Sequence, residues 1–408
     1  MNPIIYAIPV FMLTVLIEAW LAKRRGLAVY DIPDALTSLH HGVISEVTGV
    51  LWKLAGLATY TLVYKNFHAT ELPADSLAVF AFALLAYDFF YYWQHRMGHE
   101  MNLLWAAHVV HHSSEYYNLA TALRQTSTGR VFGWLFYLPM AVVGVPPTVF
   151  FTVAVTDLLY QYWVHTELIG RLGWLDRVFV TPSNHRVHHG QNDYCIDKNY
   201  GGILILWDRW FGTFADERSG EKIIYGIRKP LKSFNPVWGN FHYYADLWKE
   251  SVHATGWRAK LGVWLAPPGG WTDAPLAHFD TATFVGYDRK TPTAMRWYAA
   301  IQYALLVPSV VHVLAIDIKA MPALAVIYVL AIIATTVSIG LLLEGREIAR
   351  KIEMLRVALL GMAFSGLPDW FGFDAPLVMR FALATFALVS LIWLSRQRPV
   401  SNTAVIPT

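Results

Sequence analysis

The chain has 408 residues, 55% of them apolar and only 15% charged, and its formal net charge is +3. An average soluble domain carries about 25% charged residues, so much of this chain must lie either in an unusually large core or against lipid. No block of Lys and Arg interleaves with aromatic residues, which argues against nucleic acid as a partner. The single cysteine, Cys195, excludes an internal disulfide and a metal site built from several thiolates.

Long apolar runs favour lipid, because a helix needs about 20 mostly apolar residues to cross a membrane. Five runs precede a polar region at about residues 165–295. They lie at about 3–22, 43–64 and 76–93, and as a hairpin of two within 131–164. Four more follow, at about 297–316, 321–343, 355–367 and 376–394. The sequence therefore predicts an all-α fold, a polytopic membrane helical bundle.

Basic residues predict which side of the membrane the polar region occupies, since Lys and Arg favour the cytoplasmic side of short loops. The basic run 23–25 follows the first apolar run. Alternation of the spans from there places residues 95–130 and 165–295 in the cytoplasm. We therefore expect an integral, multi-pass protein with a cytoplasmic cap. The expected domains are N-terminal spans, a catalytic domain of spans and cap, and C-terminal spans, at residues 1–75, 76–295 and 296–408.

Eight of the sixteen histidines fall in three tight boxes. These are His95 and His99; His108, His111 and His112; and His185, His188 and His189. Residues three and four apart share one face of a helix, so the imidazoles of each box can converge. Imidazole suits iron, zinc, copper and nickel. Because eight imidazoles exceed what one octahedral ion takes, the boxes predict two metal ions on the cytoplasmic side.

Three other interpretations of the boxes compete with a two-metal site. Scattered histidines at helix ends would serve only as polar groups at the membrane interface. Structural zinc takes four ligands and usually includes Cys, whereas no box contains Cys; an all-nitrogen site with spare positions better suits iron that binds O2. A metal transporter should place its ligands near the middle of its spans, and these boxes lie at or beyond the predicted cytoplasmic ends.

Three further residues are candidates for the site. His165 ends the fifth predicted span on the side of the boxes, and we expect it to be a ninth ligand. Asp88 lies seven residues before His95 on the same helical stripe, so its carboxylate can hold the far nitrogen of an imidazole; the alternative is an ion pair at the interface. Glu100 follows His99 and is expected to bind metal, to take protons or to form a salt bridge.

The boxes and their surroundings resemble the fatty acid hydroxylase superfamily, which includes sterol desaturases and membrane lipid hydroxylases. The resembling stretch runs from about Tyr87 to Trp248. It includes His95–Glu100, Leu104–Asn118, Thr121–Gln125, Trp163–Glu167, Thr181–Gly190, Tyr194–Gly202 and Trp207–Thr213. The resemblance implies a non-haem centre of two iron ions held by the box histidines, with Glu100 also required, and O2 as the oxidant.

Within this superfamily the chain is most similar to a branch that acts on alkylglycerols. That similarity implies a membrane lipid substrate, hydroxylation of the carbon next to its ether oxygen, and tetrahydrobiopterin as reductant. The alternatives are hydroxylation or desaturation of a sterol or fatty acyl chain, and a non-catalytic metal-binding membrane protein. The sequence has no fused haem domain and no Gly-rich dinucleotide fingerprint, so we expect an external electron donor. We also expect Asp197–Gly202 to lie near the metal site, since Gly201 and Gly202 permit a tight turn.

Overall fold

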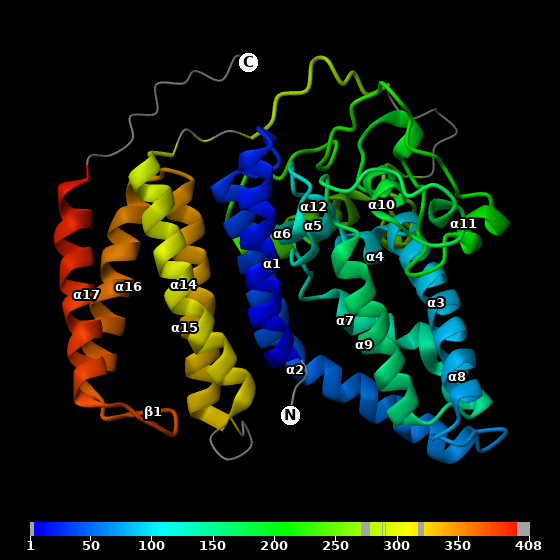
Figure 1. Ribbon diagram of the computed structural model, residues 1–408, viewed down its shortest axis with the longest axis horizontal. Helices are drawn as coiled ribbons and strands as arrows, with labels where there is room; N and C mark the ends of the chain where they lie inside the picture. The colour runs from blue at the N-terminus through cyan, green and yellow to red at the C-terminus, as the bar shows by residue number, and fades with distance from the viewer. Residues whose placement is uncertain (1–3, 271–277, 288, 290, 317–321, 398–408) are drawn as a thin grey trace. The chain divides into compact units, whose positions relative to one another are not determined.

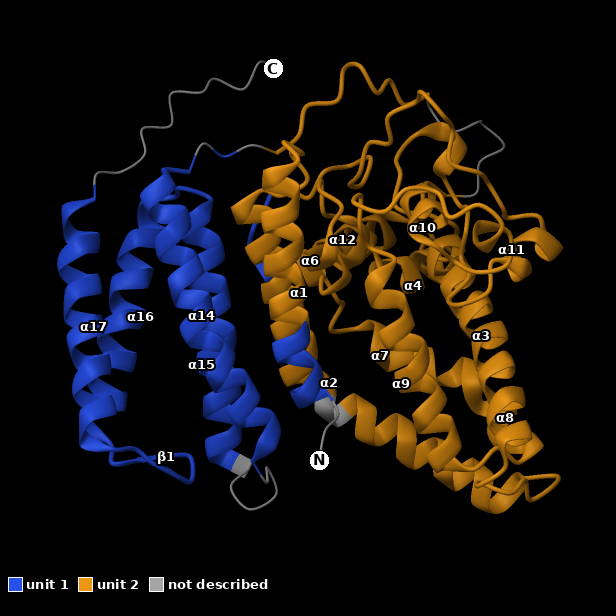
Figure 2. Cartoon of the chain, in the orientation of Figure 1, with its two compact units in different colours: residues 1–10, 232–238, 288–408 blue, residues 11–231, 239–287 orange. Residues whose placement is uncertain are grey.

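The computed structural model describes residues 4–270, 278–287, 289, 291–316 and 322–397 (Figure 1). These residues form helices joined by loops, and their only strands are the antiparallel pair β1 (Asp369–Trp370) and β2 (Phe373–Asp374). The predicted all-α fold is confirmed. Contacts within the chain divide it into two compact units (Figure 2). We call residues 11–231 and 239–287 the histidine unit, and residues 1–10, 232–238 and 288–408 the C-terminal unit.

Four long helices give the histidine unit its frame: α1 (Ile4–Arg24), which belongs to this unit from residue 11 onward, α2 (Ile32–Phe67), α3 (Leu77–Glu100) and α9 (Pro147–Trp163). α2 begins where the Asp31 side chain accepts a hydrogen bond from Asp34 N, and α3 begins with the equivalent cap by Ser76. α3 packs on α9, and α2 packs on α8 (Leu138–Val143). Tyr60, Met140 and Val153 are among the buried residues of this core.

Further helices, most of them short, complete the histidine unit and bring the boxes together. In chain order they are α4 (Asn102–Ala106), α5 (Val109–His112), α6 (Leu119–Ala122), α7 (Gly129–Phe132), η1 (Gly133–Tyr137), η2 (Leu175–Arg177), α10 (Pro182–His188), η3 (Asp193–Cys195), α11 (Leu206–Phe211), α12 (Pro236–His253) and α13 (Trp257–Leu265). The predicted polar region thus contains helices and loops between α9 and the C-terminal unit.

The C-terminal unit is built from α14 (Thr293–Ala315), α15 (Pro322–Leu343), α16 (Glu347–Gly366) and α17 (Leu377–Arg396), which pack in sequence order. Its interior contains a charged pair. Glu353 is fully buried and accepts hydrogen bonds from Tyr298 Oη, Ser338 Oγ and Arg356. A buried carboxylate needs such partners, since an unpaired charge in the interior is strongly destabilising.

Five helices are long and apolar enough to cross a membrane by length and composition: α1, α3, α14, residues 323–343 of α15, and α17. They match five of the predicted spans, and an integral membrane protein is therefore supported. The other four predicted spans are helical but fail that criterion. α2 carries Glu46 and Lys53, α16 carries Glu353 and Arg356, and the hairpin is divided into short helices, of which α9 contains Asp157.

Candidate metal centre

Two short helices and two helix ends carry the nine histidines that the sequence singled out. The last two turns of α3 carry the first box, α5 and the residue before it carry the second, and α10 and the residue after it carry the third. α10 begins where Thr181 N donates to Asn184 Oδ1 and Pro182 occupies the first turn, both of which favour a helix start. His165 lies two residues after the end of α9. All nine imidazoles are therefore positioned by helices of the histidine unit.

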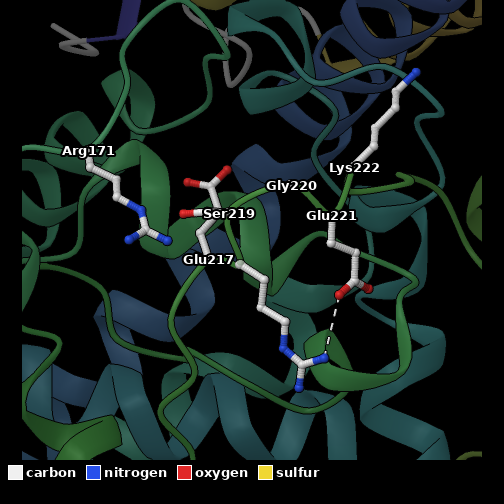
Figure 3. Close-up of a pocket in the computed structure, with 7 residues that line it drawn as sticks. Arg171, Glu217, Ser219, Gly220, Glu221 and Lys222 are labelled. Carbon is white, nitrogen blue, oxygen red and sulfur yellow. Dashed lines mark hydrogen bonds and ion pairs between the residues drawn. The ribbon is translucent and has the colours of Figure 1, made fainter.

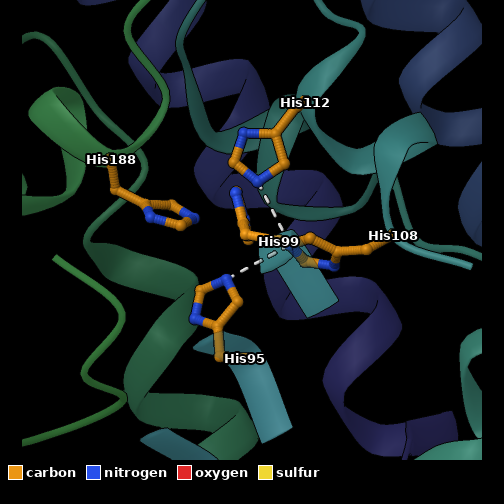
Figure 4. Close-up of side chains that lie close together, drawn as sticks. All are labelled: His95, His99, His108, His112 and His188. Atoms are coloured by element: carbon orange, nitrogen blue, oxygen red, sulfur yellow. Dashed lines mark hydrogen bonds between the residues drawn. The ribbon is translucent and has the colours of Figure 1, made fainter. Parts of the chain in front are cut away.

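The first cluster consists of five imidazoles that point toward one another (Figure 4). Its members are His95, His99, His108, His112 and His188, and one ring nitrogen of each lies within 4.8 Å of the others. His108 Nε2 lies 3.1 Å from both His95 Nε2 and His112 Nε2. The buried Nε2 atoms of His99 and His188 have no hydrogen-bond partner within the described residues.

The second cluster consists of His111, His165, His185 and His189, whose ligand nitrogens also lie within 4.8 Å of one another. His165 Nε2 is 3.3 Å from His111 Nε2 and 3.1 Å from His185 Nε2. His189 Nε2 is 3.2 Å from His185 Nε2. The two clusters adjoin, since the rings of His112 and His189 stack with their centroids 4.4 Å apart.

The boxes do not each form one cluster, which differs from the expectation that the imidazoles of a box converge. His111 belongs to the second cluster, whereas His108 and His112 belong to the first. The third box divides in the same way, with only His188 in the first cluster. Adjacent residues of one helical turn point in different directions. α5 and α10 therefore lie between the clusters and contribute to both.

Hydrogen bonds to the outer ring nitrogens determine which nitrogen faces the cluster. His95 Nδ1 lies 2.9 Å from the Tyr200 carbonyl oxygen, and His188 Nδ1 lies 2.9 Å from the Lys198 carbonyl oxygen. Because a carbonyl only accepts, each Nδ1 carries the hydrogen, and each neutral ring presents a lone pair at Nε2. Lone pairs that face one another cannot form hydrogen bonds, whereas a cation between them binds both. The donor set of the first cluster therefore fits a metal ion.

Burial keeps the imidazoles in the neutral form. Together with neighbouring imidazoles, it lowers the pKa of His108, His112 and His188 well below the usual value. In the second cluster, burial lowers the pKa of His111 to about 4, and that of His165 well below its usual value. Neutral imidazole is the form that binds metal, so both clusters are ready to bind ions at neutral pH.

One loop, residues 197–200, supports the first cluster from outside. Besides the carbonyl groups of Lys198 and Tyr200, it places Asp197 Oδ1 3.8 Å from His99 Nδ1. Asp197 and Asn199 have φ angles of 55° and 59°, in the left-handed region. The buried Asn199 side chain fixes this conformation by donating to the carbonyl groups of residues 184 and 215 and accepting from the amide of residue 215. The loop therefore orients three of the five imidazoles.

Asp88 does not contact an imidazole among the described residues, contrary to the role expected for it. Its carboxylate accepts hydrogen bonds from Ile203 N at 2.6 Å, Leu204 N at 3.0 Å and Trp207 Nε1 at 2.8 Å. Asp88 therefore anchors the chain just after the loop that holds His95. Gly202 lies where a Cβ would be only 2.9 Å from the Asp88 carboxylate, which explains a glycine at this position.

Glu100 forms a salt bridge with Arg96, at 2.9 Å between Oε1 and Nε, and is partly exposed. Salt bridging was one of the three roles expected for it. Burial raises the pKa of the nearby Asp197 carboxyl, and the charge of Glu100 raises it further. The end of α3 and the 197–200 loop thus bring two carboxylates to the edge of the first cluster.

A surface pocket of about 460 Å³ lies on the polar region (Figure 3). It is lined by Arg171, Glu217, Arg218, Ser219, Gly220, Glu221 and Lys222. Glu217 connects its wall to α10, because it accepts hydrogen bonds from Arg186 Nε and Nη2 at 2.9 and 2.8 Å. Arg186 follows His185 in the third box. The wall of the pocket is thus linked to the helix that carries the third box, and none of its lining residues is a histidine.

The chain is similar to known proteins over nearly its whole length. The family model for fatty acid hydroxylases matches residues 80–213, which carry all nine histidines. An alkylglycerol monooxygenase from Danio rerio is 41% identical over 96% of this chain and 88% of its own length. The alkylglycerol monooxygenase from Homo sapiens is 37% identical over 94% of this chain and 86% of its own length. No solved structure matches the chain.

A more distant relative has a different substrate in its name. An ornithine lipid hydroxylase from Rhizobium tropici is 27% identical over 47% of this chain and 59% of its own length. The similarity to the alkylglycerol monooxygenases, by contrast, extends over nearly the whole chain, including both the N-terminal helices and the C-terminal unit.

Proposed function

The chain belongs to the alkylglycerol monooxygenase family, and from this membership we propose that it oxidises the carbon next to the ether oxygen of an alkylglycerol. Family membership makes it an O2-dependent membrane lipid monooxygenase. The observation that carries the proposal is the pair of adjoining clusters of buried imidazoles in a chain with near full-length similarity to these enzymes.

We propose that the two clusters each hold one iron ion, with all nine histidines as ligands. Five imidazoles in the first cluster exceed the four ligands usual for structural zinc. Iron bound there would supply the activation of O2 that attack on an alkyl C–H bond requires. The protein's part is to present neutral imidazoles, to hold them by outer hydrogen bonds, and to exclude water from a buried centre.

The proposed reaction consumes one lipid, one O2, two electrons and two protons. One oxygen atom enters the C–H bond and the other leaves as water. A hydroxyl on the carbon next to an ether oxygen forms a hemiacetal, which collapses to an aldehyde and a glycerol. We propose that the electrons come from an external donor and that this donor is tetrahydrobiopterin, on the strength of the family resemblance.

The proposed orientation places the metal centre on the cytoplasmic side of the membrane. Arg25, at the basic end of α1, donates to the Leu168 carbonyl oxygen at 3.4 Å. The basic residues 23–25 and the chain just after His165 therefore lie at the same end of the histidine unit. The preference of Lys and Arg for the cytoplasmic side then supports a cytoplasmic position for the histidines.

A turnover assay with purified protein and isotopically labelled oxygen gas tests the proposal. It compares tetrahydrobiopterin with a ferredoxin system over alkylglycerol, fatty acyl and sterol substrates. We expect pterin-dependent aldehyde release from alkylglycerol only. Turnover with a sterol and ferredoxin alone would reject this substrate and reductant. Metal analysis of the same sample is expected to give two iron ions per chain; zinc without iron would reject the assignment of the metal.

A further inference from the structure

The 197–200 loop bonds to imidazoles of the first cluster, whereas His111 and His165 of the second cluster bond to other segments among the described residues. His111 Nδ1 lies 3.1 Å from the Arg124 carbonyl oxygen. His165 Nδ1 lies 2.8 Å from the Gln161 carbonyl oxygen. Both imidazoles are thus oriented by backbone carbonyls, and their positions depend on the contacts that hold the surrounding segments in place.

Arg124 is held by the start of α2. Its guanidinium is almost fully buried and uses each of its nitrogens. Nη2 donates to Asp34 Oδ1 at 2.6 Å, Nε donates to Ser38 Oγ at 3.0 Å, and Nη1 donates to Ser113 Oγ at 3.0 Å. The other carboxylate oxygen of Asp34 accepts from Ser114 Oγ. Asp34 therefore ties two positions that follow the second box, residues 114 and 124, to one point on α2.

The chain beside His165 is held by α1. Glu18 is buried in the histidine unit and accepts a hydrogen bond from Thr166 Oγ1, the residue after His165. The same carboxylate accepts from Leu119 N at 2.7 Å and from Tyr30 Oη at 2.5 Å. Glu18 therefore joins the segment after α9 to the segment after the second box.

Asp34 and Glu18 are similar in position and in contacts. Each lies in the N-terminal part of the chain, each is buried, and each connects two segments that flank ligands of the second cluster. Neither contacts a residue of the first cluster among the described residues. A hydrogen bond to a charged group is worth about 1.5–3 kcal/mol, so each carboxylate is a firm anchor.

We propose that Asp34 and Glu18 are positioning residues for the second metal ion, and that the N-terminal helices act as the outer shell of that site. This inference rests on the proposed two-metal centre. Loss of Asp34 frees the segment whose carbonyl orients His111, and loss of Glu18 frees the chain that directly follows His165. The 197–200 loop meanwhile continues to hold three imidazoles of the first cluster. The second ion is then bound more weakly than the first.

The test is anaerobic titration of metal-free, full-length protein in detergent with Fe²⁺, counting bound ions per chain. We expect D34N and T166V to bind the first ion normally and the second about 10- to 100-fold more weakly, the usual effect of losing an outer-shell partner. T166S keeps the hydroxyl that donates to Glu18, and is expected to bind both ions normally. E46Q is the matched control, because Glu46 also pairs α2 with an arginine, Arg130, that orients no histidine.

Double variants show which of the two metal sites depends on Asp34. D34N combined with H111A should lose no more iron than H111A alone, whereas D34N combined with H95A should impair both sites. Normal binding of both ions by D34N and T166V would overturn the positioning role and leave the metal centre intact. Equal loss of both ions would overturn its selectivity. Wild-type protein that binds no pair of ions would overturn the metal centre itself. If D34N does not fold, the Thr166 pair decides alone.

Discussion

The two histidine clusters contain the same kind of ligand but depend on different parts of the chain. In the first cluster, the outer nitrogens of His95 and His188 bond to a loop that begins nine residues after His188. In the second cluster, the segments that orient His111 and His165 are tied to α1 and α2 by Glu18 and Asp34. The loop that supports the first site thus follows the third box, whereas the carboxylates that anchor the second site lie in the first two helices of the chain. This difference makes the two sites separately vulnerable to mutation.

The largest effect is expected from removing a ligand. H188A should remove the ion of the first cluster, H165A that of the second, and both should abolish turnover. The losses should exceed the about 10- to 100-fold effect of an outer-shell change. Iron content and turnover of purified variants measure this. H68A is the control, since His68 pairs with Glu71 outside both clusters. Full iron content and turnover in H165A would remove His165 from the ligand set.

Asp88 gives the next largest effect. D88A leaves three donors without their acceptor: the half-buried amides of Ile203 and Leu204 and the buried Nε1 of Trp207. Each buried unsatisfied group costs about 1–3 kcal/mol. We expect a lower unfolding temperature and weaker binding of the first ion only, measured by thermal denaturation and Fe²⁺ titration. D75N, at an exposed carboxylate before α3, should change neither. Selective loss of the second ion in D88A would contradict the assignment of separate supports to the two clusters.

Two substitutions of Asn199 separate the effect of the loop conformation from the effect of the hydrogen bonds that the side chain makes. N199G tolerates the φ of 59° but loses the side chain, whereas N199A also places a Cβ in the left-handed region, which costs roughly 1–2 kcal/mol more. We expect N199A to weaken the first ion more than N199G, by about tenfold within the usual outer-shell range. Equal Fe²⁺ affinities in the two variants would show that the hydrogen bonds alone matter.

The pH dependence of the metal-free protein is a smaller, graded effect. The pKa of His111 is lowered to about 4 by burial, below its usual value near 6.5. The unfolded chain therefore binds protons first, and stability is fully present above about pH 6.5 and is lost as the pH falls toward 4. Denaturant unfolding of metal-free protein at several pH values measures this. H111Q should have a shallower pH dependence between pH 6.5 and 4 than the wild type.

Substitution of Glu100 should have the smallest effect on stability, and it distinguishes a catalytic role of the carboxylate from a purely structural one. Its partly exposed salt bridge with Arg96 is worth about 0–1 kcal/mol. E100Q and R96Q should therefore unfold close to the wild-type temperature. If Glu100 is needed for catalysis, as the family resemblance implies, E100Q alone should lose turnover. Equal turnover in the two variants would show that Glu100 acts only through its salt bridge with Arg96.

The sequence predicted the helices and the histidines well because both follow simple periodicities. Spacings of three and four residues identified the boxes, and apolar length identified α1, α3, α14, α15 and α17 as spans. It did not predict how each box divides between clusters, since that depends on the direction of single-turn helices. It also missed Asp34 and Glu18, whose partners lie 90 and 148 residues away along the chain; only a map of long-range contacts could reveal them.

The division of the boxes has a consequence for how the protein is made. Each cluster draws ligands from segments on both sides of α9, and neither is complete until the ribosome has passed residue 188. The first box, at the end of α3, has only two imidazoles to offer while the chain is still being inserted. A chain truncated before α10 would offer the first cluster four of its five imidazoles and the second cluster two of its four, so we expect both sites to be complete only after the helices up to α9 have been made.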